Sequence, residues 1–186
     1  MRRGRPPSRG ELRPGTRGPR VPRRGGSHPV RVAILSDTHG RLVPDVFRHL
    51  EGVDQIVHAG DIGPPDLLPE LRALAPVTAV WGNSDGLAMR AEVPEVARRV
   101  WEGHTIVILH GHQAGMPTPE AVAKMYPDAH LVVFGHTHEP VIERVGPVLA
   151  VNPGSCTAPR SGPHPTLVLA DIDEQGIRTT LIELVP

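Results

Sequence analysis

The sequence predicts an α/β fold with a largely parallel β-sheet, on the basis of three observations. Up to residue 80, three short runs of apolar and β-branched residues alternate with segments whose apolar residues recur at helical spacing. Each of these runs ends in a loop that carries a carboxylate or an amide side chain. Strands that alternate with helices form parallel sheets, and ligands bind at the carboxyl ends of such strands. We therefore expect the three loops to converge on one edge of the sheet.

The composition fits a single domain with a core of aliphatic residues. A length of 186 residues is enough to bury a sizeable core, and only 3% of the residues are aromatic, so Val, Ile, Leu and Ala must fill it. The chain has no run of eighteen apolar residues, and its N-terminus lacks an apolar signal segment. Its single cysteine, Cys156, allows no disulfide framework. We expect a cytoplasmic protein with no membrane partner. The sequence does not specify the oligomeric state.

A formal net charge of zero conceals two unlike regions. Residues 1–29 contain nine arginines and one acid, Glu11, with hardly an apolar side chain, and we expect them to be disordered. An RNA-binding arm is one interpretation, but the segment has no aromatic residues for base stacking, so a dispensable extension is favoured. The predicted domain, 30–186, holds eleven basic and nineteen acidic residues, which argues against broad nucleic-acid binding.

The first part of the domain contains three expected strands and two expected helices. The strands span 30–35, 55–59 and 76–80, and the helices span 44–50 and 64–74. Pro44 and the pair Pro64–Pro65 stand near the first turns of these helices, where proline is tolerated. Residues 86–94 are predicted to form a loop.

The second part is predicted to consist mainly of hairpins. Strands are expected at 96–101, 105–109, 131–134, 141–145, 148–151, 166–172 and 177–184. Turns are expected at Gly103, at Gly146–Pro147, at 152–155 and at 173–176. One helix is predicted from Pro119 to Met125, with Thr118 as its cap.

Seven side chains with nitrogen or oxygen ligand atoms lie where predicted strands end. They are Asp37, His39, Asp61, Asn83, His110, His136 and His138. In extended backbone, residues i and i+2 point the same way, so His136 and His138 can face one site. Seven ligands are too many for one four-coordinate ion, and they suit two ions about 3.5–4 Å apart that share a carboxylate. Carboxylates and an amide mixed with imidazoles favour Mn, Fe, Zn or Co.

The order Asp-x-His, Gly-Asp, Gly-Asn, His and Gly-His-x-His resembles the calcineurin-like metallophosphoesterases. Gly-Asn-Ser-Asp at 82–85 and Asn-Pro-Gly-Ser at 152–155 are similar to the small bacterial and archaeal phosphodiesterases of that superfamily, which include relatives of the retromer subunit. The resemblance covers residues 30–186. It implies a four-layer α/β/β/α sandwich, in which two mixed sheets lie face to face with helices outside.

The resemblance also implies two divalent metal ions. One would be held by Asp37, His39, Asp61 and His138, and the other by Asp61, Asn83, His110 and His136, with Asp61 as the bridge. Manganese is the expected metal, and zinc, iron, cobalt, nickel and magnesium are the alternatives. The residues expected to take part in catalysis are Asp61, Asn83 and His110.

The implied activity is hydrolysis of phosphoesters. Phosphodiesters are the expected substrates. Two divalent ions against two aspartates leave a net charge of about plus two, which attracts a phosphate ester and lowers the pKa of a bridging water. The metal-bridging hydroxide would attack phosphorus in line, while the NH₂ group of Asn83 donates to a phosphate oxygen. The alternative is a non-catalytic, metal-binding scaffold of the same fold, and the retention of all seven ligands argues against it.

One position departs from the pattern of the larger members of the superfamily. Where those proteins carry a histidine thought to protonate the leaving group, this chain has Ser84. A missing general acid lowers the rate by about 10²–10⁴-fold, so we expect slow turnover unless the leaving group is good, as in aryl or nucleotidyl esters. His112 is a candidate substitute if its loop folds inward. For His58 and Asp85, a role in orienting ligands and a purely structural role both stay open.

Overall fold

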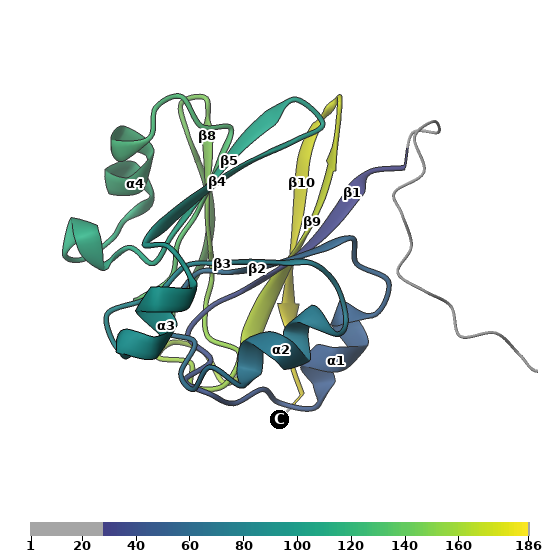
Figure 1. Ribbon diagram of the computed structural model, residues 1–186. Helices are drawn as coiled ribbons and strands as arrows, with labels where there is room; N and C mark the ends of the chain where they lie inside the picture. The colour runs from purple at the N-terminus through teal and green to yellow at the C-terminus, as the bar shows by residue number, and fades with distance from the viewer. Residues whose placement is uncertain (1–27, 186) are drawn as a thin grey trace, which may run out of the picture.

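The computed structural model describes residues 28–185. It contains two five-stranded sheets packed face to face, with helices on their outer faces (Figure 1). This arrangement confirms the predicted four-layer α/β/β/α sandwich with two mixed sheets. The expected disorder of residues 1–29 concerns residues outside the described part of the chain, apart from His28 and Pro29.

The elements alternate early in the chain and form hairpins later. Strands β1 (Val30–Leu35), β2 (Gln55–His58) and β3 (Val77–Ala79) alternate with helices α1 (Asp45–Leu50), α2 (Leu67–Arg72) and α3 (Leu87–Glu92). The hairpin of β4 (Val96–Trp101) and β5 (His104–Leu109) precedes a 3₁₀ turn (His112–Ala114), helix α4 (Pro119–Met125) and β6 (Leu131–Val133). Two further hairpins follow, β7 (Pro140–Val145) with β8 (Val148–Pro153) and β9 (Thr166–Asp173) with β10 (Gly176–Glu183).

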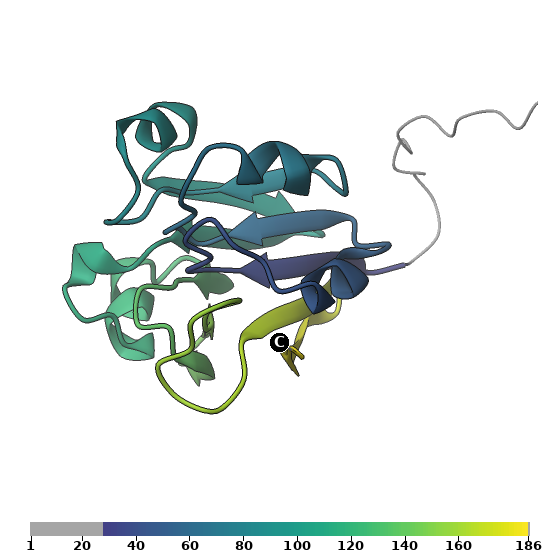
Figure 2. The same ribbon diagram turned by 90° about the horizontal axis from the view of Figure 1, so that it is seen from below.

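Both sheets contain a group of parallel strands flanked by antiparallel ones. In sheet A, ordered β10-β9-β1-β2-β3, the parallel group is β1, β2 and β3. In sheet B, ordered β4-β5-β6-β8-β7, it is β5, β6 and β8. Figure 2 shows β3, β2, β1 and β9 side by side, with α1 and α2 in front of them. All seven predicted ligands follow strands of the parallel groups.

Alternation along the strands divides the apolar side chains among three layers of core. In β1, Ala33 and Leu35 pack in the cluster that includes residues of α1 and α2, whereas Val32 and Ile34 pack in the cluster between the two sheets. A third cluster lies between sheet B and α4, where Val122 is fully buried. Aliphatic residues and alanine dominate these clusters, as the scarcity of aromatic residues predicts.

The prediction of a loop over 86–94 is wrong, because Leu87–Glu92 form α3. All six residues are good helix formers, but only Met89 is buried, so no apolar period marks the segment. The helix predicted over 64–74 is shorter than expected and spans Leu67–Arg72. The turn expected at 152–155 begins later, since β8 continues through Pro153.

Other local predictions are confirmed. Oγ1 of Thr118 accepts a hydrogen bond from the backbone N–H of Ala121 at 3.2 Å and caps α4. The turn between β4 and β5 consists of Glu102 and Gly103, with φ of 49° and 82°, a two-residue hairpin turn that suits glycine. Within residues 28–185, no helix has the length and apolar character needed to cross a membrane.

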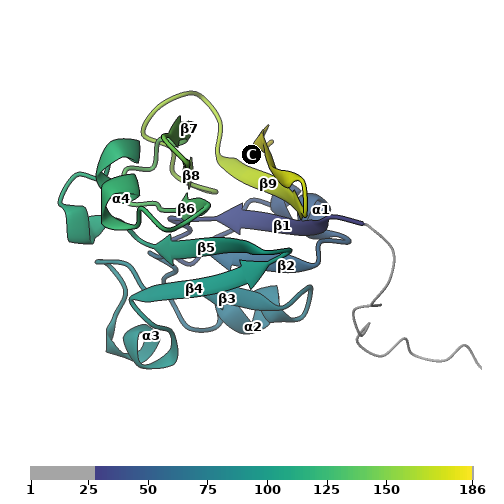
Figure 3. The ribbon, with the colours of Figure 1, turned by 90° about the horizontal axis from the view of Figure 1, so that it is seen from above.

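The carboxyl ends of the parallel strands share one end of the molecule. This end carries α3 and α4 and lies opposite the start of β1 (Figure 3). The loops that leave β1, β2, β3, β5 and β6 meet here, which brings together groups from positions 37 to 138 of the chain. The candidate site is built from these loops.

Candidate metal centre

The loops after β1, β2 and β6 have an unusual backbone. Among residues 28–185, six non-glycine residues have positive φ, and five of them are predicted ligands. These five are Asp37 (53°), His39 (48°), Asp61 (52°), His136 (73°) and His138 (60°). Such conformations cost on the order of 1–3 kcal/mol each and persist where the surrounding structure enforces them. The premise that extended backbone aligns His136 and His138 is therefore wrong, because both residues lie in the left-handed region.

Three glycines allow neighbouring groups to come close to the backbone. An added Cβ on Gly82 would fall on Oδ1 of Asp61, and one on Gly135 would collide with the loop that follows β1. A Cβ on Gly60 would lie 2.7 Å from Nδ1 of His110. Glycine is thus required at these positions because ligand side chains or a ligand-bearing loop occupy the space.

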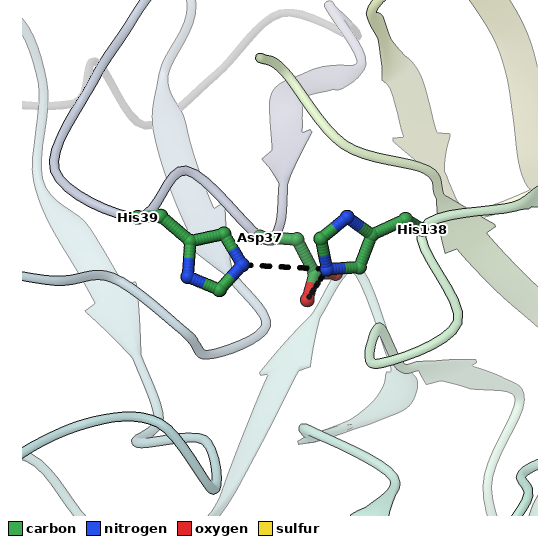
Figure 4. A group of neighbouring side chains, drawn as sticks. All are labelled: Asp37, His39 and His138. Carbon is green, nitrogen blue, oxygen red and sulfur yellow. Dashed lines mark hydrogen bonds and ion pairs between the residues drawn. The ribbon is translucent and has the colours of Figure 1, made fainter. Parts of the chain in front are cut away.

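Asp37, His39 and His138 form the first cluster of candidate ligands, from the loops after β1 and β6 (Figure 4). The Nε2 atoms of His39 and His138 are 3.3 Å apart, and Nε2 of His138 lies 3.2 Å from Oδ1 of Asp37. Asp37 and His138 are buried, whereas the side chain of His39 is 40% exposed. The cluster is therefore open to solvent on the side of His39.

The lone pairs of this cluster point at one another. Nδ1 of His138 donates to the carbonyl oxygen of Ala158 at 2.8 Å, so the neutral ring presents an unprotonated Nε2 to the site. Oδ1 of Asp37 is buried and has no hydrogen-bond donor. Buried acceptors that converge in this way are stabilised by a shared cation, and a carboxylate with two imidazoles suits a divalent metal.

His110, Asp61 and Asn83 form a second cluster, from the loops after β5, β2 and β3. Nε2 of His110 lies 3.1 Å from Oδ1 of Asn83 and 3.4 Å from Oδ1 of Asp61. Nδ1 of His110 donates to the carbonyl oxygen of Ala59 at 2.8 Å, so Nε2 of the neutral ring again faces oxygen atoms without a proton. This cluster, too, has the ligand atoms and the fixed tautomer that a metal ion requires.

Asp61 lies between the two clusters. Its Oδ1 faces His110, and its Oδ2 lies 3.9 Å from Nε2 of His39. Oδ1 also accepts a hydrogen bond from the backbone N–H of Ser84 at 2.9 Å. Burial opposes ionisation of Asp61, but His110 and Ser84 outweigh it, and the pKa of the carboxyl lies well below its ordinary value. An ionised carboxylate that faces both clusters has the position a bridging ligand needs.

The surroundings of the two buried histidines, His110 and His138, raise their pKa values. Burial lowers the pKa of His110, but the hydrogen bond with Asp61 and the charge of Asp37 outweigh burial, so the net shift is upward. The carboxylate of Asp37 likewise raises the pKa of His138. Protons and metal ions compete for the same nitrogen atoms, so both shifts show that the aspartates favour cations in each cluster.

His136 adjoins the second cluster without entering it. Its backbone N–H donates to Oδ2 of Asp37 at 3.1 Å, and its ring stands edge-on to that of His110, with centroids 5.2 Å apart. Burial, followed by the charge of His110, lowers the pKa of His136. It belongs to neither compact group of candidate ligands. The structure thus brings six of the seven predicted side chains within contact distance and leaves His136 beside them.

His58 and Asp85, whose roles the sequence left open, act on the backbone of the loops. Nδ1 of His58 accepts from the N–H of Gly60 at 3.2 Å, and Nε2 donates to Oγ1 of Thr38 at 2.9 Å. Burial lowers the pKa of His58 to about 4, so the ring is neutral. The buried carboxylate of Asp85 accepts from the N–H of Gly82 at 2.8 Å and from two N–H groups of the β2 loop. Both residues therefore fix the loops rather than the ligand side chains.

The segment at the end of β8 makes contacts that sequence reasoning missed. Nδ2 of Asn152 donates to the carbonyl oxygen of Gly135 and to Oγ1 of Thr137, both at 3.0 Å. Oγ of Ser155 donates to the carbonyl oxygen of Asp37 at 2.7 Å. The Asn-Pro-Gly-Ser pattern signals only a turn, and its partners lie far away in the sequence. The folded chain uses this turn to join the two loops of the first cluster.

His112 lies beside the second cluster. Its ring centroid is 5.5 Å from that of His110 and 5.2 Å from that of Trp81, and the guanidinium of Arg90 lies 4.6 Å from the Trp81 ring. Arg90 also donates to the carbonyl oxygen of Asn83 at 3.2 Å. Burial lowers the pKa of His112. The loop of His112 does fold inward, as a substitute acid requires, and its action as that acid stays a prediction.

Known proteins are similar to this chain in sequence and fold. Residues 30–175 match the model of the calcineurin-like phosphoesterase superfamily domain. A probable metallophosphoesterase of Methanothermobacter thermautotrophicus is 32% identical over 161 residues, which cover 81% of this chain and 91% of that protein. A phosphodiesterase of Methanocaldococcus jannaschii is 29% identical over 173 residues, which cover 83% of this chain and 100% of that protein.

Among solved structures, wild-type Vps29 of Entamoeba histolytica in complex with Zn²⁺ has a similar fold. The TM-score is 0.70 at 21% identity, and the match covers 82% of this chain and 98% of that one. At this identity the likeness supports the fold alone. The family follows from the sequence matches over most of the chain: this protein belongs to the calcineurin-like phosphoesterase superfamily.

Proposed function

We propose that the protein is a metal-dependent phosphodiesterase with a dinuclear centre. The observation that carries this proposal is the convergence of two clusters of candidate ligand atoms on Asp61. Relatives named metallophosphoesterase and phosphodiesterase support the same class of reaction and a phosphoester as the substrate.

The two ions would share one bridging residue. Asp37, His39, Asp61 and His138 would hold one ion, and Asp61, Asn83, His110 and His136 would hold the other. Ions bound there would supply Lewis-acid activation of water and neutralisation of charge on the phosphate. The buried Oδ1 of Asp37 and the fixed tautomers of His110 and His138 fit this requirement. Manganese is the expected metal, because it accepts carboxylate, amide and imidazole ligands together.

The loop after β3 would contribute to substrate binding and limit the choice of leaving group. Asn83 is exposed, and its amide oxygen faces His110, so its NH₂ group can donate to a phosphate oxygen. Ser84 turns its backbone N–H toward Asp61, and its hydroxyl is a poor acid at neutral pH. Departure of the leaving group then depends on its own acidity, so aryl and nucleotidyl esters should react fastest.

The test is hydrolysis of bis(p-nitrophenyl) phosphate by the full chain loaded with Mn²⁺. We expect metal-dependent turnover that falls by about 10²–10³-fold in Asp61→Asn, because this variant removes the bridging charge at nearly constant size. Asp128→Asn is the matched control, since it makes the same change on an exposed carboxylate that pairs with Arg98. Circular dichroism checks that both variants are folded.

Three results would decide the matter. No turnover by the Mn²⁺-loaded wild type, or full turnover by folded Asp61→Asn, contradicts the proposal. Bound metal without turnover of any aryl or nucleotidyl ester supports the alternative, a non-catalytic metal-binding scaffold. A chain that binds no divalent metal contradicts both interpretations.

A further inference from the structure

The loop that follows β8, residues 156–165, is fastened to the metal centre near its start. Oγ1 of Thr157 donates to the carbonyl oxygen of Thr38 at 3.2 Å. The carbonyl oxygen of Ala158 accepts the hydrogen bond from Nδ1 of His138 at 2.8 Å. These contacts join the loop to both loops of the first cluster. Arg160 follows only two residues later, so its backbone is held at the edge of the site.

Arg160 differs from the paired arginines of the surface. Its side chain is exposed and forms no ion pair or hydrogen bond with any residue between 28 and 185. Four other arginines each pair with a carboxylate: Arg48, Arg72, Arg98 and Arg178. A guanidinium group without a counter-ion is ready to bind an anion, and its planar array of donors matches the oxygen atoms of a phosphate.

The position of Arg160 adds positive charge at the edge of the centre, two residues after the carbonyl group that holds His138. Two divalent ions against Asp37, Asp61 and the bridging hydroxide would leave about one positive charge, and Arg160 adds another beside it. A simple phosphodiester carries one negative charge, so the site would hold more positive charge than that substrate needs. A substrate with a further anionic group matches it better.

We propose that Arg160 binds a second phosphate group of the substrate, next to the phosphodiester that is cleaved. The inference rests on the proposed phosphodiesterase activity and names its substrate class, phosphodiesters that carry an additional phosphate. Arg160 is a binding residue and takes no part in breaking the bond. Because it holds substrate and transition state alike, its loss should raise KM and leave kcat nearly unchanged.

The test compares two esters that release p-nitrophenolate from the same bond. One is thymidine 5′-(p-nitrophenyl phosphate), and the other is the same ester with a 3′-phosphate. For the Mn²⁺-loaded wild type, we expect the lower KM with the 3′-phosphate. Arg160→Gln should raise that KM by about 10- to 100-fold, the effect of losing a charged hydrogen bond, and change the KM of the simple ester little.

A binding measurement without turnover gives an independent readout. Calorimetric titration should show that thymidine 3′,5′-bisphosphate binds the wild type more tightly than thymidine 5′-phosphate, and that Arg160→Gln abolishes the difference. Arg160→Lys, which keeps the charge but loses the forked geometry, should restore part of it. Arg144→Gln is the charge-matched control, because Arg144 lies near the end of β7 that is remote from the site. Within the described residues, its side chain bonds only to the carbonyl oxygen of Pro147.

The outcomes separate this inference from the proposed function. If the wild type hydrolyses both esters and Arg160→Gln keeps the same preference for the 3′-phosphate, the role of Arg160 is wrong and the phosphodiesterase proposal stands. A change of equal size in Arg144→Gln also overturns the inference, because bulk charge would explain it. If the metal-loaded wild type hydrolyses neither ester, the proposed function itself fails.

Discussion

The two ends of the sheets use glycine for different purposes. At the hairpin end, Gly103 and Gly146 adopt positive φ in turns, and an added Cβ on either would meet nothing within 4 Å. At the metal-centre end, Cβ atoms on Gly60, Gly82 and Gly135 would collide with ligand side chains or loops. Glycines such as Gly60 have positive φ there too, and so do five non-glycine residues, all of them predicted ligands. One end is shaped by local turn chemistry, the other by contacts among distant loops.

Replacing a histidine of the Gly-His-x-His loop should have the largest effect. We expect His136→Asn and His138→Asn each to lower phosphodiester hydrolysis by about 10²–10³-fold, because each would remove a proposed ligand from a different ion. Metal analysis of each variant should find one Mn²⁺ fewer per chain. His104→Asn, at the hairpin end, should keep both ions, although it loses a contact with the carbonyl oxygen of Asp173. Two retained ions in His136→Asn would remove that residue from the ligand set.

The same glycine substitution at the two ends should separate function from stability. Gly82→Ala places a Cβ on Oδ1 of Asp61, so we expect lost metal and a destabilisation of about 1–3 kcal/mol from overpacking. Gly103→Ala strains a residue with φ of 82° in open space, so it should destabilise by about 1–2 kcal/mol and keep its metal. Urea unfolding and metal analysis measure both effects. Full metal content in Gly82→Ala would show that metal binding does not need the close approach of Asp61 to the backbone of Gly82.

His58 should make the metal-free protein sensitive to acid. The folded state keeps His58 neutral down to a pKa of about 4, whereas the unfolded chain takes up the proton near 6.5. Its contribution to the free energy of unfolding therefore falls as the pH drops from 6.5 to 4, by about 3 kcal/mol in total. His58→Gln can still donate to Thr38 but does not titrate, so it should flatten this part of the urea-unfolding profile.

His110 and His138 provide the internal contrast for this prediction. Their pKa values are raised, so the stability they confer on the metal-free fold is present below pH 6.5 and is lost as the pH rises through the raised pKa values. They remain in both proteins, so the difference between wild type and His58→Gln isolates His58. Parallel pH profiles for the two proteins would contradict the assignment.

Arg90 should have a smaller effect, since it contacts the backbone of Asn83, a proposed ligand, and not its side chain. It donates to the carbonyl oxygens of Asp85 and Asn83, at 2.8 and 3.2 Å, and it packs on Trp81. We expect Arg90→Gln to lower activity and Mn²⁺ affinity by about tenfold, at the low end for groups that orient metal ligands. Arg178→Gln removes an exposed ion pair at the hairpin end and should change neither quantity. Equal activity and equal Mn²⁺ affinity in the two variants would show that Arg90 does not contribute to the metal centre.

Much of the fold could be predicted because its signals are local. The bounds of β1 and α4 agree with the prediction, and Thr118 caps α4 as expected. Helix α3 escaped prediction because only Met89 of its six residues is buried, so no apolar period marks the segment.

The candidate site was predicted in part. The order of the ligands and their placement after strands point to the seven residues, and six of them meet in the structure. The left-handed backbone of Asp37 and Asp61 leaves no mark in the sequence, because neighbouring loops impose it. Asn152 and Ala158 contact loops that lie far away in the sequence, and no local pattern reports these contacts.

The central claim is that two metal ions bind at the carboxyl ends of the parallel strands and share Asp61. Equilibrium dialysis of the full chain against Mn²⁺ at neutral pH, followed by metal analysis, tests it most directly. We predict two ions per chain for the wild type and fewer than two for Asp61→Asn. A stoichiometry of one or none for the wild type, or of two for both proteins, would contradict the account.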